Sequence, residues 1–114
     1  QEVIRSLLAW SEAWSAQDVQ AYLSHYSSNY QPDDGLSLEE WRAQRSRRLN
    51  RPSWISVDLE DFQVTTTGPD TVQVKLIQEY RADTYRDRTL KSMNLVREDG
   101  QWRIFLERSL GFVE

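Results

Sequence analysis

Residues 55–64 read ISVDLEDFQV, and within this stretch the spacing of the apolar side chains changes. Before Pro52 the apolar residues recur every three or four positions, whereas here they recur at every second position, as in a half-buried β-strand. The alternation resumes at Phe62 with the opposite parity, so an extra residue near Glu60–Asp61 predicts a β-bulge. The stretch divides the chain into a helical first half and a strand-forming second half.

Three more alternating runs follow, at 72–80, 91–95 and 102–106. The turn sequences at 68–70 and 98–100 separate neighbouring runs, and both contain the glycine and aspartate typical of tight turns. Four strands joined in this way predict an antiparallel meander. The residues predicted on its inward parity include Gln78, Tyr80, Lys91, Met93, Leu95, Trp102, Ile104 and Leu106.

The first half predicts three helices. Residues 2–15 carry apolar side chains at helical spacing. Asp18 is a suitable N-cap for a short second helix, with Tyr22 and Tyr26 on its apolar stripe. The composition of residues 31–35 then predicts a turn.

The third helix is predicted to begin after Ser37 and to end near Asn50. Ser37 and Glu40 have the spacing of a capping box, and Pro52 prevents much further continuation. Three helices followed by four antiparallel strands predict an α+β fold, with three N-terminal helices packed on a curved four-stranded sheet. Such a sheet and helix set encloses a cone whose open end is a natural pocket.

Composition and charge exclude several classes of protein. The chain has 114 residues, and 14 basic against 18 acidic side chains leave a net charge of −4. No apolar run approaches the roughly 20 residues that a membrane-spanning helix needs. There is no cysteine, which excludes disulfides and a thiol nucleophile. We expect residues 1–114 to form a single domain, and because the first residue is Gln1, we expect it to be a fragment of a longer chain.

Five arginines fall within the ten residues 42–51. Such a cluster could contact the phosphates of a nucleic acid, but the net negative charge of the chain argues against this. A solvated helix face is the favoured interpretation, so we expect no nucleic-acid partner.

Arg45 is the most informative member of this cluster, because it shares a helix face with Trp41 and Leu49. An arginine that points toward the core needs a carboxylate or a ligand anion opposite it. Glu79 and Glu107, both on predicted strands, are the candidates. The pair could hold helix to sheet, or Arg45 could bind a ligand at the mouth of a pocket.

Lys91 raises the same question on a strand, since it shares its parity with apolar neighbours. Its ammonium could reach solvent past the strand end. Alternatively, Lys91, Gln78 and Tyr80 form a polar ring around an aromatic cavity, where a ligand completes their hydrogen bonds.

No pattern of a known catalytic or cofactor site is present. His25 is the only histidine, and it lies on the flank of the second helix rather than on its apolar stripe. One histidine without clustered carboxylates offers too few ligands for a metal, and the four glycines form no phosphate-binding loop. We therefore expect no catalytic residue, no metal site and no cofactor.

The order and spacing of several motifs resemble the nuclear transport factor 2-like (NTF2-like, also SnoaL-like) superfamily. In the first half these are Trp10-x-x-x-Trp14, Tyr22, Tyr26, Tyr30-x-Pro32 and Trp41-x-x-x-Arg45. In the second half they are Ile55-x-Val57, Val74-x-x-x-Gln78-x-Tyr80, Tyr85, Lys91-x-x-x-Leu95 and Gly100-x-Trp102-x-Ile104-x-x-Glu107. The pattern is most similar to the C-terminal domain of bacterial L,D-transpeptidase-type peptidoglycan carboxypeptidases and of envelope proteins with tetratricopeptide repeats.

This resemblance implies a cone-shaped fold, often dimeric through the sheet, in a bacterial periplasmic protein. It implies a non-catalytic ligand-binding and dimerisation module whose covalently attached partner domain is missing from this fragment. The superfamily also contains isomerases and dehydratases, so the alternative is a lyase or isomerase that uses Tyr26 or His25 with Glu79 or Glu107. The cone is expected to hold a small polar ligand or a peptide segment, with a lining of Trp14, Tyr22, Tyr26, Trp41, Arg45, Gln78, Tyr80, Lys91 and Glu107.

The opposite parity of the strands also carries apolar residues, which predicts a second functional surface. These are Ile77, Leu90, Val96 and Phe105. Because an exposed apolar patch usually marks an interface, we expect a homodimer through the outer face of the sheet.

Overall fold

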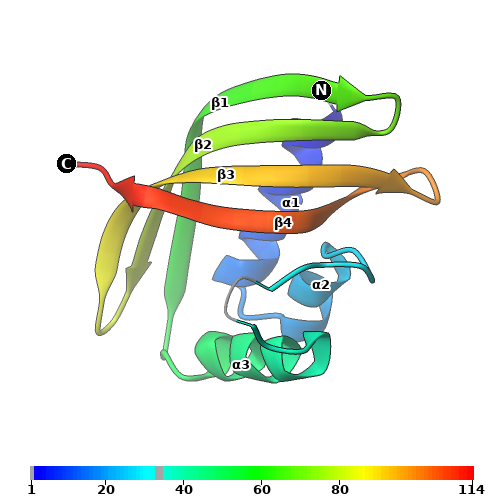
Figure 1. Cartoon of the computed structure of the whole chain (residues 1–114). Helices are drawn as coiled ribbons and strands as arrows, with labels where there is room; N and C mark the ends of the chain where they lie inside the picture. Colours follow the sequence, from blue (N-terminus) through cyan, green and yellow to red (C-terminus); the bar gives the residue numbers. More distant parts are fainter. Residues whose placement is uncertain (1, 33–34) are drawn as a thin grey trace.

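The computed structural model describes residues 2–32 and 35–114 (Figure 1). The predicted turn at 31–35 includes Asp33 and Asp34, which lie outside the described residues. The order of elements is the predicted one, three helices and then four strands. They are α1 (Glu2–Ser15), α2 (Val19–Ser24), α3 (Leu38–Asn50), β1 (Ile55–Gly68), β2 (Thr71–Ala82), β3 (Arg86–Glu98) and β4 (Gln101–Phe112).

Local capping explains where the short helices begin. The Asp18 side chain accepts a hydrogen bond from the Ala21 amide at the start of α2. At the start of α3, Ser37 and Glu40 form the predicted capping box. One expectation is wrong: Tyr26 is not part of α2 but lies two residues beyond its end, where it forms a parallel bridge with Ile104.

The four strands form one antiparallel sheet in the order β1-β2-β3-β4. The register of β1 against β2 shifts between Glu60 and Gln63, and Asp61 has a positive φ of 57°. This confirms the β-bulge predicted from the change of parity. The sheet is strongly bent, with α1 on its concave side and α3 across one end (Figure 1).

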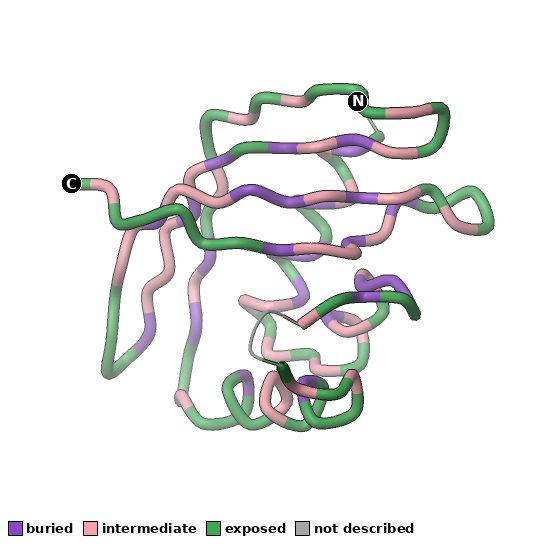
Figure 2. The backbone as a smooth tube through the Cα atoms, viewed as in Figure 1, coloured by how far each residue is buried: buried purple, intermediate pink, exposed green. Residues whose placement is uncertain are grey.

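The core lies between α1, α2 and the concave face of the sheet. Its fully buried members include Trp10, Leu76, Met93 and Ile104. Figure 2 shows buried residues alternating with exposed or half-buried ones along β2, as expected for a sheet with one covered face. The structure therefore confirms the predicted α+β fold.

A second bulge, which the sequence analysis missed, lies in β4. Leu95 pairs with Ile104 and Asn94 pairs with Leu106, so Phe105 is an extra residue. The bulge reverses the parity of the rest of the strand. Leu106 is therefore only half-buried and off the inner face, contrary to prediction, whereas Glu107 pairs with Met93 and is buried.

The outer face of the sheet carries apolar and charged residues. Ile77 and Leu90 are paired across β2 and β3, and both are half-buried. Glu79 pairs with Arg88 in the register of these strands, so it is on the outer face and is not the partner of Arg45. None of the helices in the described residues has the length and apolar character needed to cross a lipid bilayer.

Candidate ligand-binding cleft

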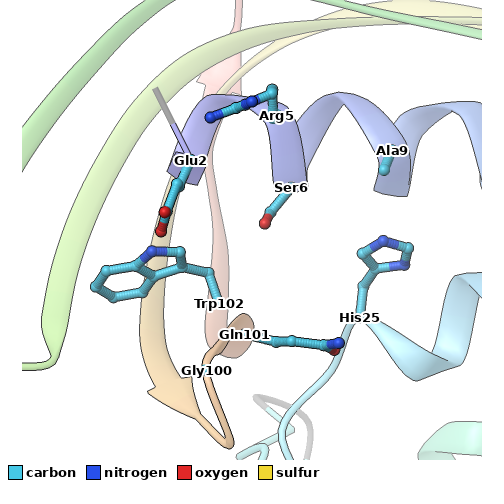
Figure 3. Close-up of a pocket in the computed structure, with 8 residues that line it drawn as sticks. All are labelled: Glu2, Arg5, Ser6, Ala9, His25, Gly100, Gln101 and Trp102. Atoms are coloured by element: carbon cyan, nitrogen blue, oxygen red, sulfur yellow. The ribbon is translucent and has the colours of Figure 1, made fainter.

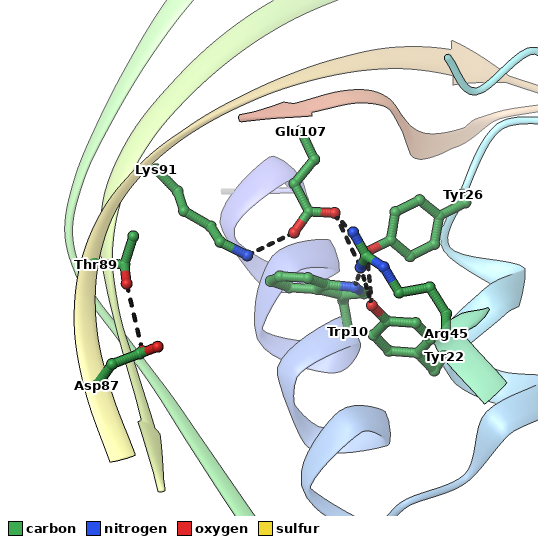
Figure 4. Close-up of polar contacts among 8 residues, drawn as sticks. All are labelled: Trp10, Tyr22, Tyr26, Arg45, Asp87, Thr89, Lys91 and Glu107. Atoms are coloured by element: carbon green, nitrogen blue, oxygen red, sulfur yellow. Dashed lines mark hydrogen bonds and ion pairs between the residues drawn. The ribbon is translucent and has the colours of Figure 1, made fainter. Parts of the chain in front are cut away.

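One buried carboxylate, that of Glu107, organises the polar contacts inside the cone. The Glu107 side chain is 3% exposed. Its Oε1 accepts a hydrogen bond from the Tyr26 hydroxyl at 2.8 Å and lies 3.4 Å from Arg45 Nη1, and its Oε2 accepts from Lys91 Nζ at 2.6 Å (Figure 4). Side chains of α3, of β3 and of the segment after α2 therefore meet at one residue of β4.

Hydroxyl and indole groups surround the carboxylate on its inner side. Trp10 Nε1 donates to the Tyr26 hydroxyl at 3.1 Å, and the Tyr22 and Tyr26 hydroxyls are 3.0 Å apart. Arg45 Nη1 donates to the Tyr22 hydroxyl at 2.6 Å. We call Glu107, Lys91, Arg45, Tyr22, Tyr26 and Trp10 the Glu107 cluster.

At neutral pH the Glu107 carboxyl group is ionised and the hydroxyls of Tyr22 and Tyr26 are neutral. Burial opposes ionisation of Glu107, but the nearby charges of Lys91 and Arg45, with hydrogen bonds from Lys91 and Tyr26, lower its pKa to about 2. Burial raises the pKa of Tyr22, and burial together with the Glu107 charge raises that of Tyr26 well above its usual value. The cluster contains two cations and one anion.

Two cavities open beside the cluster and share Lys91 and Ser109 in their walls. The first, which we call the basic cavity, has a volume of about 240 Å³ and is lined by Arg45, Arg48 and Glu107 among others. The second, the aromatic cavity, has a volume of about 300 Å³. It lies between α1 and the ends of β2, β3 and β4. Together they form the cleft.

The structure brings most of the predicted lining residues to this cleft. Those that line one or both cavities are Trp14, Trp41, Arg45, Gln78, Tyr80, Lys91 and Glu107. Tyr22 and Tyr26 line neither cavity: both are buried behind Glu107, and Tyr26 borders a separate cavity beside α2 instead. They support the cleft through the hydrogen bonds described above.

Several residues of the cleft escaped the sequence analysis. Ser109 faces the cleft only because the β4 bulge reverses the parity, and Asp87 and Phe112 lie near strand ends where no apolar alternation marks them. Arg48 belongs to the arginine cluster that the sequence predicts to be a solvated helix face, yet it lines the basic cavity. Trp10 is on the apolar face of the helix predicted for residues 2–15, and nothing in the sequence indicates that its indole N–H has a polar partner.

The single histidine lies at a different place. His25 lines a cavity of about 390 Å³ between the start of α1 and the β3–β4 turn, where Arg5 and Trp102 are also found (Figure 3). Its Nδ1 lies 2.9 Å from the carbonyl oxygen of Ala21. Within residues 2–32 and 35–114, no three His, Cys, Asp or Glu side chains gather into a set that could hold a metal ion.

Comparisons with known proteins place this geometry in a family. The family of Cds6 C-terminal NTF2-like domains matches residues 2–108. Bd1075 of Bdellovibrio bacteriovorus superimposes with a TM-score of 0.88 at 22% identity, over 100% of this chain and 41% of that one. The helical cell shape determining protein Pgp2 of Campylobacter jejuni, as its K307A mutant, gives a TM-score of 0.84 at 17% identity, over 93% and 39%. No curated protein sequence matches.

Another solved structure has a different description. An NTF2-like family protein of Streptomyces avermitilis, described as a "putative dehydratase", gives a TM-score of 0.80 at 16% identity, over 95% of this chain and 91% of that one. At these identities the likeness shows the fold alone. In length, the chain spans about two fifths of Bd1075 and Pgp2 but nearly the whole of the Streptomyces protein.

Proposed function

Because the chain belongs to the family of Cds6 C-terminal NTF2-like domains, we propose that it is a non-catalytic module that binds a small polar ligand or a peptide segment in its cleft. The observation that carries this proposal is the Glu107 cluster. Its carboxylate is held ionised between Lys91 and Arg45, with distances of 2.6 and 3.4 Å. A carboxylate locked in this way fixes two cations at the edge of a cleft, which suits binding better than proton transfer.

We further propose that this module, residues 1–114, serves a larger bacterial envelope protein with a peptidoglycan-related role, in the periplasm. The likeness to Pgp2, a cell shape determining protein, supports this setting. So does the length of Bd1075 and Pgp2, whose chains extend well beyond the part that this fold covers. In this proposal a covalently attached domain carries any chemistry, and the cleft holds the ligand.

The test is an NMR titration of the 114-residue chain with soluble peptidoglycan fragments. Binding in the cleft is expected to shift the indole N–H signals of Trp14 and Trp41, which line its two cavities. Lys91→Gln is expected to weaken binding by about 10-fold, because the ligand loses a charge-assisted hydrogen bond to the Lys91 ammonium. The chain has only two lysines, so Lys75→Gln on the exposed outer face is a matched control. Spectra that stay unchanged at millimolar concentrations of the fragments would contradict the proposal.

We also propose that the module forms a homodimer through the outer face of the sheet. Ile77, Leu90 and Val96 are half-buried in the isolated chain and lie on neighbouring strands of that face. Ion pairs of Arg81 with Asp58 and of Arg88 with Glu60 lie beside them. Apolar side chains with charged neighbours are typical of a protein interface with a polar rim.

A second candidate function is a lyase or isomerase activity in the cone. The hydrogen bond from the Tyr26 hydroxyl to Glu107 favours it, because a phenol and a carboxylate in a buried site can serve acid–base chemistry. Against it, the pKa of Glu107 is lowered to about 2, which makes this group a weak base. His25 lines another cavity and Glu79 is on the outer face.

A further inference from the structure

The aromatic cavity differs in chemistry from the basic cavity beside it. Three rings form part of its wall, with centroids 5.5 Å apart for Trp14 and Tyr80 and 6.3 Å apart for Tyr80 and Tyr85. Ring faces at such spacing attract ammonium groups through their quadrupoles. The Trp14 ring already faces the Lys91 ammonium, which lies 5.4 Å from its centroid, so the rings of Tyr80 and Tyr85 are the ones that favour a cationic ligand group.

The charge of this cavity points the same way. Asp87 lines it, and the Thr89 hydroxyl donates to the Asp87 carboxylate at 3.4 Å. No ion pair involves Asp87 among the described residues. Lys91, the cation that lines this cavity, is on the same strand, but its ammonium donates to Glu107 and lies over the Trp14 ring rather than pairing with Asp87 (Figure 4). A negative charge is thus left without a cation.

A buried amide adds an acceptor without a partner. Gln78 is 4% exposed and lines the aromatic cavity, and its Oε1 has no hydrogen-bond partner among the described residues. A buried oxygen in this state costs free energy that an incoming N–H group would recover. Asp87 and Gln78 together offer acceptors for the N–H groups of an ammonium.

The basic cavity offers the complementary set. Arg45 and Lys91 outnumber Glu107 by one charge, and Arg48 adds a further cation that has no ion pair among the described residues. Trp41 is 3% exposed, and its indole N–H lacks a partner there. These are donors and positive charges, which suit a carboxylate.

We infer that the two cavities form one site for a zwitterionic ligand, with its ammonium group in the aromatic cavity near Asp87 and its carboxylate in the basic cavity near Arg48. The inference rests on the proposed function, because it names the ligand class of the same cleft. An amino acid or a short peptide with free ends has this chemistry. Lys91 and Ser109, which belong to both walls, lie where the two halves of the ligand meet.

Three matched probes test the inference by NMR titration of the 114-residue chain: triglycine, N-acetyltriglycine and triglycine amide. Triglycine is expected to bind about 10-fold more tightly than either blocked form, since each blocked form loses one charge-assisted contact. Asp87→Asn is expected to weaken triglycine and triglycine amide but to leave N-acetyltriglycine unchanged. Asp83→Asn is the matched control, because Asp83 is on the same hairpin, is exposed and does not line the cavity.

Arg48→Gln should show the reverse selectivity, weakening triglycine and N-acetyltriglycine but not triglycine amide. Arg47→Gln is its control on the same helix. Equal affinity for triglycine and both blocked forms would overturn the inference while cleft binding stands. Failure of all three probes, with peptidoglycan fragments still shifting the Trp14 and Trp41 signals, would also overturn only the inference. Failure of every ligand would overturn the proposed function as well.

Discussion

Lys91 and Glu107 are diagonal neighbours on β3 and β4, and Lys91 Nζ lies 2.6 Å from Glu107 Oε2. Lys91 pairs directly with Ser109 and Glu107 pairs with Met93, so the two side chains reach toward each other across one register step. Both are well buried, with side-chain exposures of 11% and 3%. The pair links the sheet to the arginine of α3 and makes the cleft sensitive to acid.

Acid should destabilise the protein through Glu107. Its pKa is lowered from an ordinary value of 4.5 to about 2, so ionised Glu107 stabilises the folded state above pH 4.5. That stabilisation, about 3 kcal/mol, is lost as the pH falls from 4.5 toward 2. Urea unfolding at several pH values measures it. The difference in stability between wild type and Glu107→Gln should shrink over this range; a constant difference would show that Glu107 does not titrate as described.

Arg45→Ala should cost about 3 kcal/mol of stability, since it removes one of two cations from a buried carboxylate. The Arg45 side chain is 16% exposed and also donates to the Tyr22 hydroxyl at 2.6 Å. Urea denaturation of both proteins gives the difference. Arg47→Ala, at an exposed position of the same helix, is the control and should stay within about 0.5 kcal/mol of wild type. A loss for Arg45→Ala as small as that of the control would mean that the guanidinium is solvated.

The inward direction of Arg45 could be predicted because helical spacing places it on the face of Trp41 and Leu49, and both of these are buried. Its partner could not be chosen, because the choice depends on the bulge at Phe105. On strict alternation Leu106 faces the core and Glu107 faces outward. The bulge reverses this, and no glycine or other local signal marks it.

The cleft was only partly predictable for a related reason. Alternation identified Gln78, Tyr80 and Lys91 on the concave face, and all three line the cavities. Spacing alone could not show that Tyr22 and Tyr26 lie behind Glu107, since burial depth depends on how α2 packs on the sheet. Nor could it place Asp87, whose contribution depends on the curvature of the β2–β3 hairpin.

The proposed dimer predicts that Leu90→Asp converts the protein to a monomer. A charge opposite Ile77 on the outer face would have to be buried in the interface without a partner. Light scattering should change from twice the chain mass to 13.5 kDa. Leu8→Asp places the same charge on α1, where Leu8 is 40% exposed, and should leave the dimer intact. A wild-type mass of 13.5 kDa at high concentration would contradict the proposed interface.

The last prediction is that the isolated chain catalyses no turnover. General acid–base catalysis needs a group that exchanges its proton near the working pH, within reach of substrate. Glu107 stays ionised above pH 4.5, and the pKa of Tyr26 is raised well above its usual value by burial and by the Glu107 charge, so neither group exchanges a proton at pH 7.

The assay incubates the chain with peptidoglycan fragments and with small enolisable ketones, and follows products by mass spectrometry and proton exchange by NMR. Turnover that disappears in Glu107→Gln but persists in His25→Ala would identify the cone as an active site and overturn the binding-module proposal. Loss only in His25→Ala would move the activity to the cavity beside the β3–β4 turn.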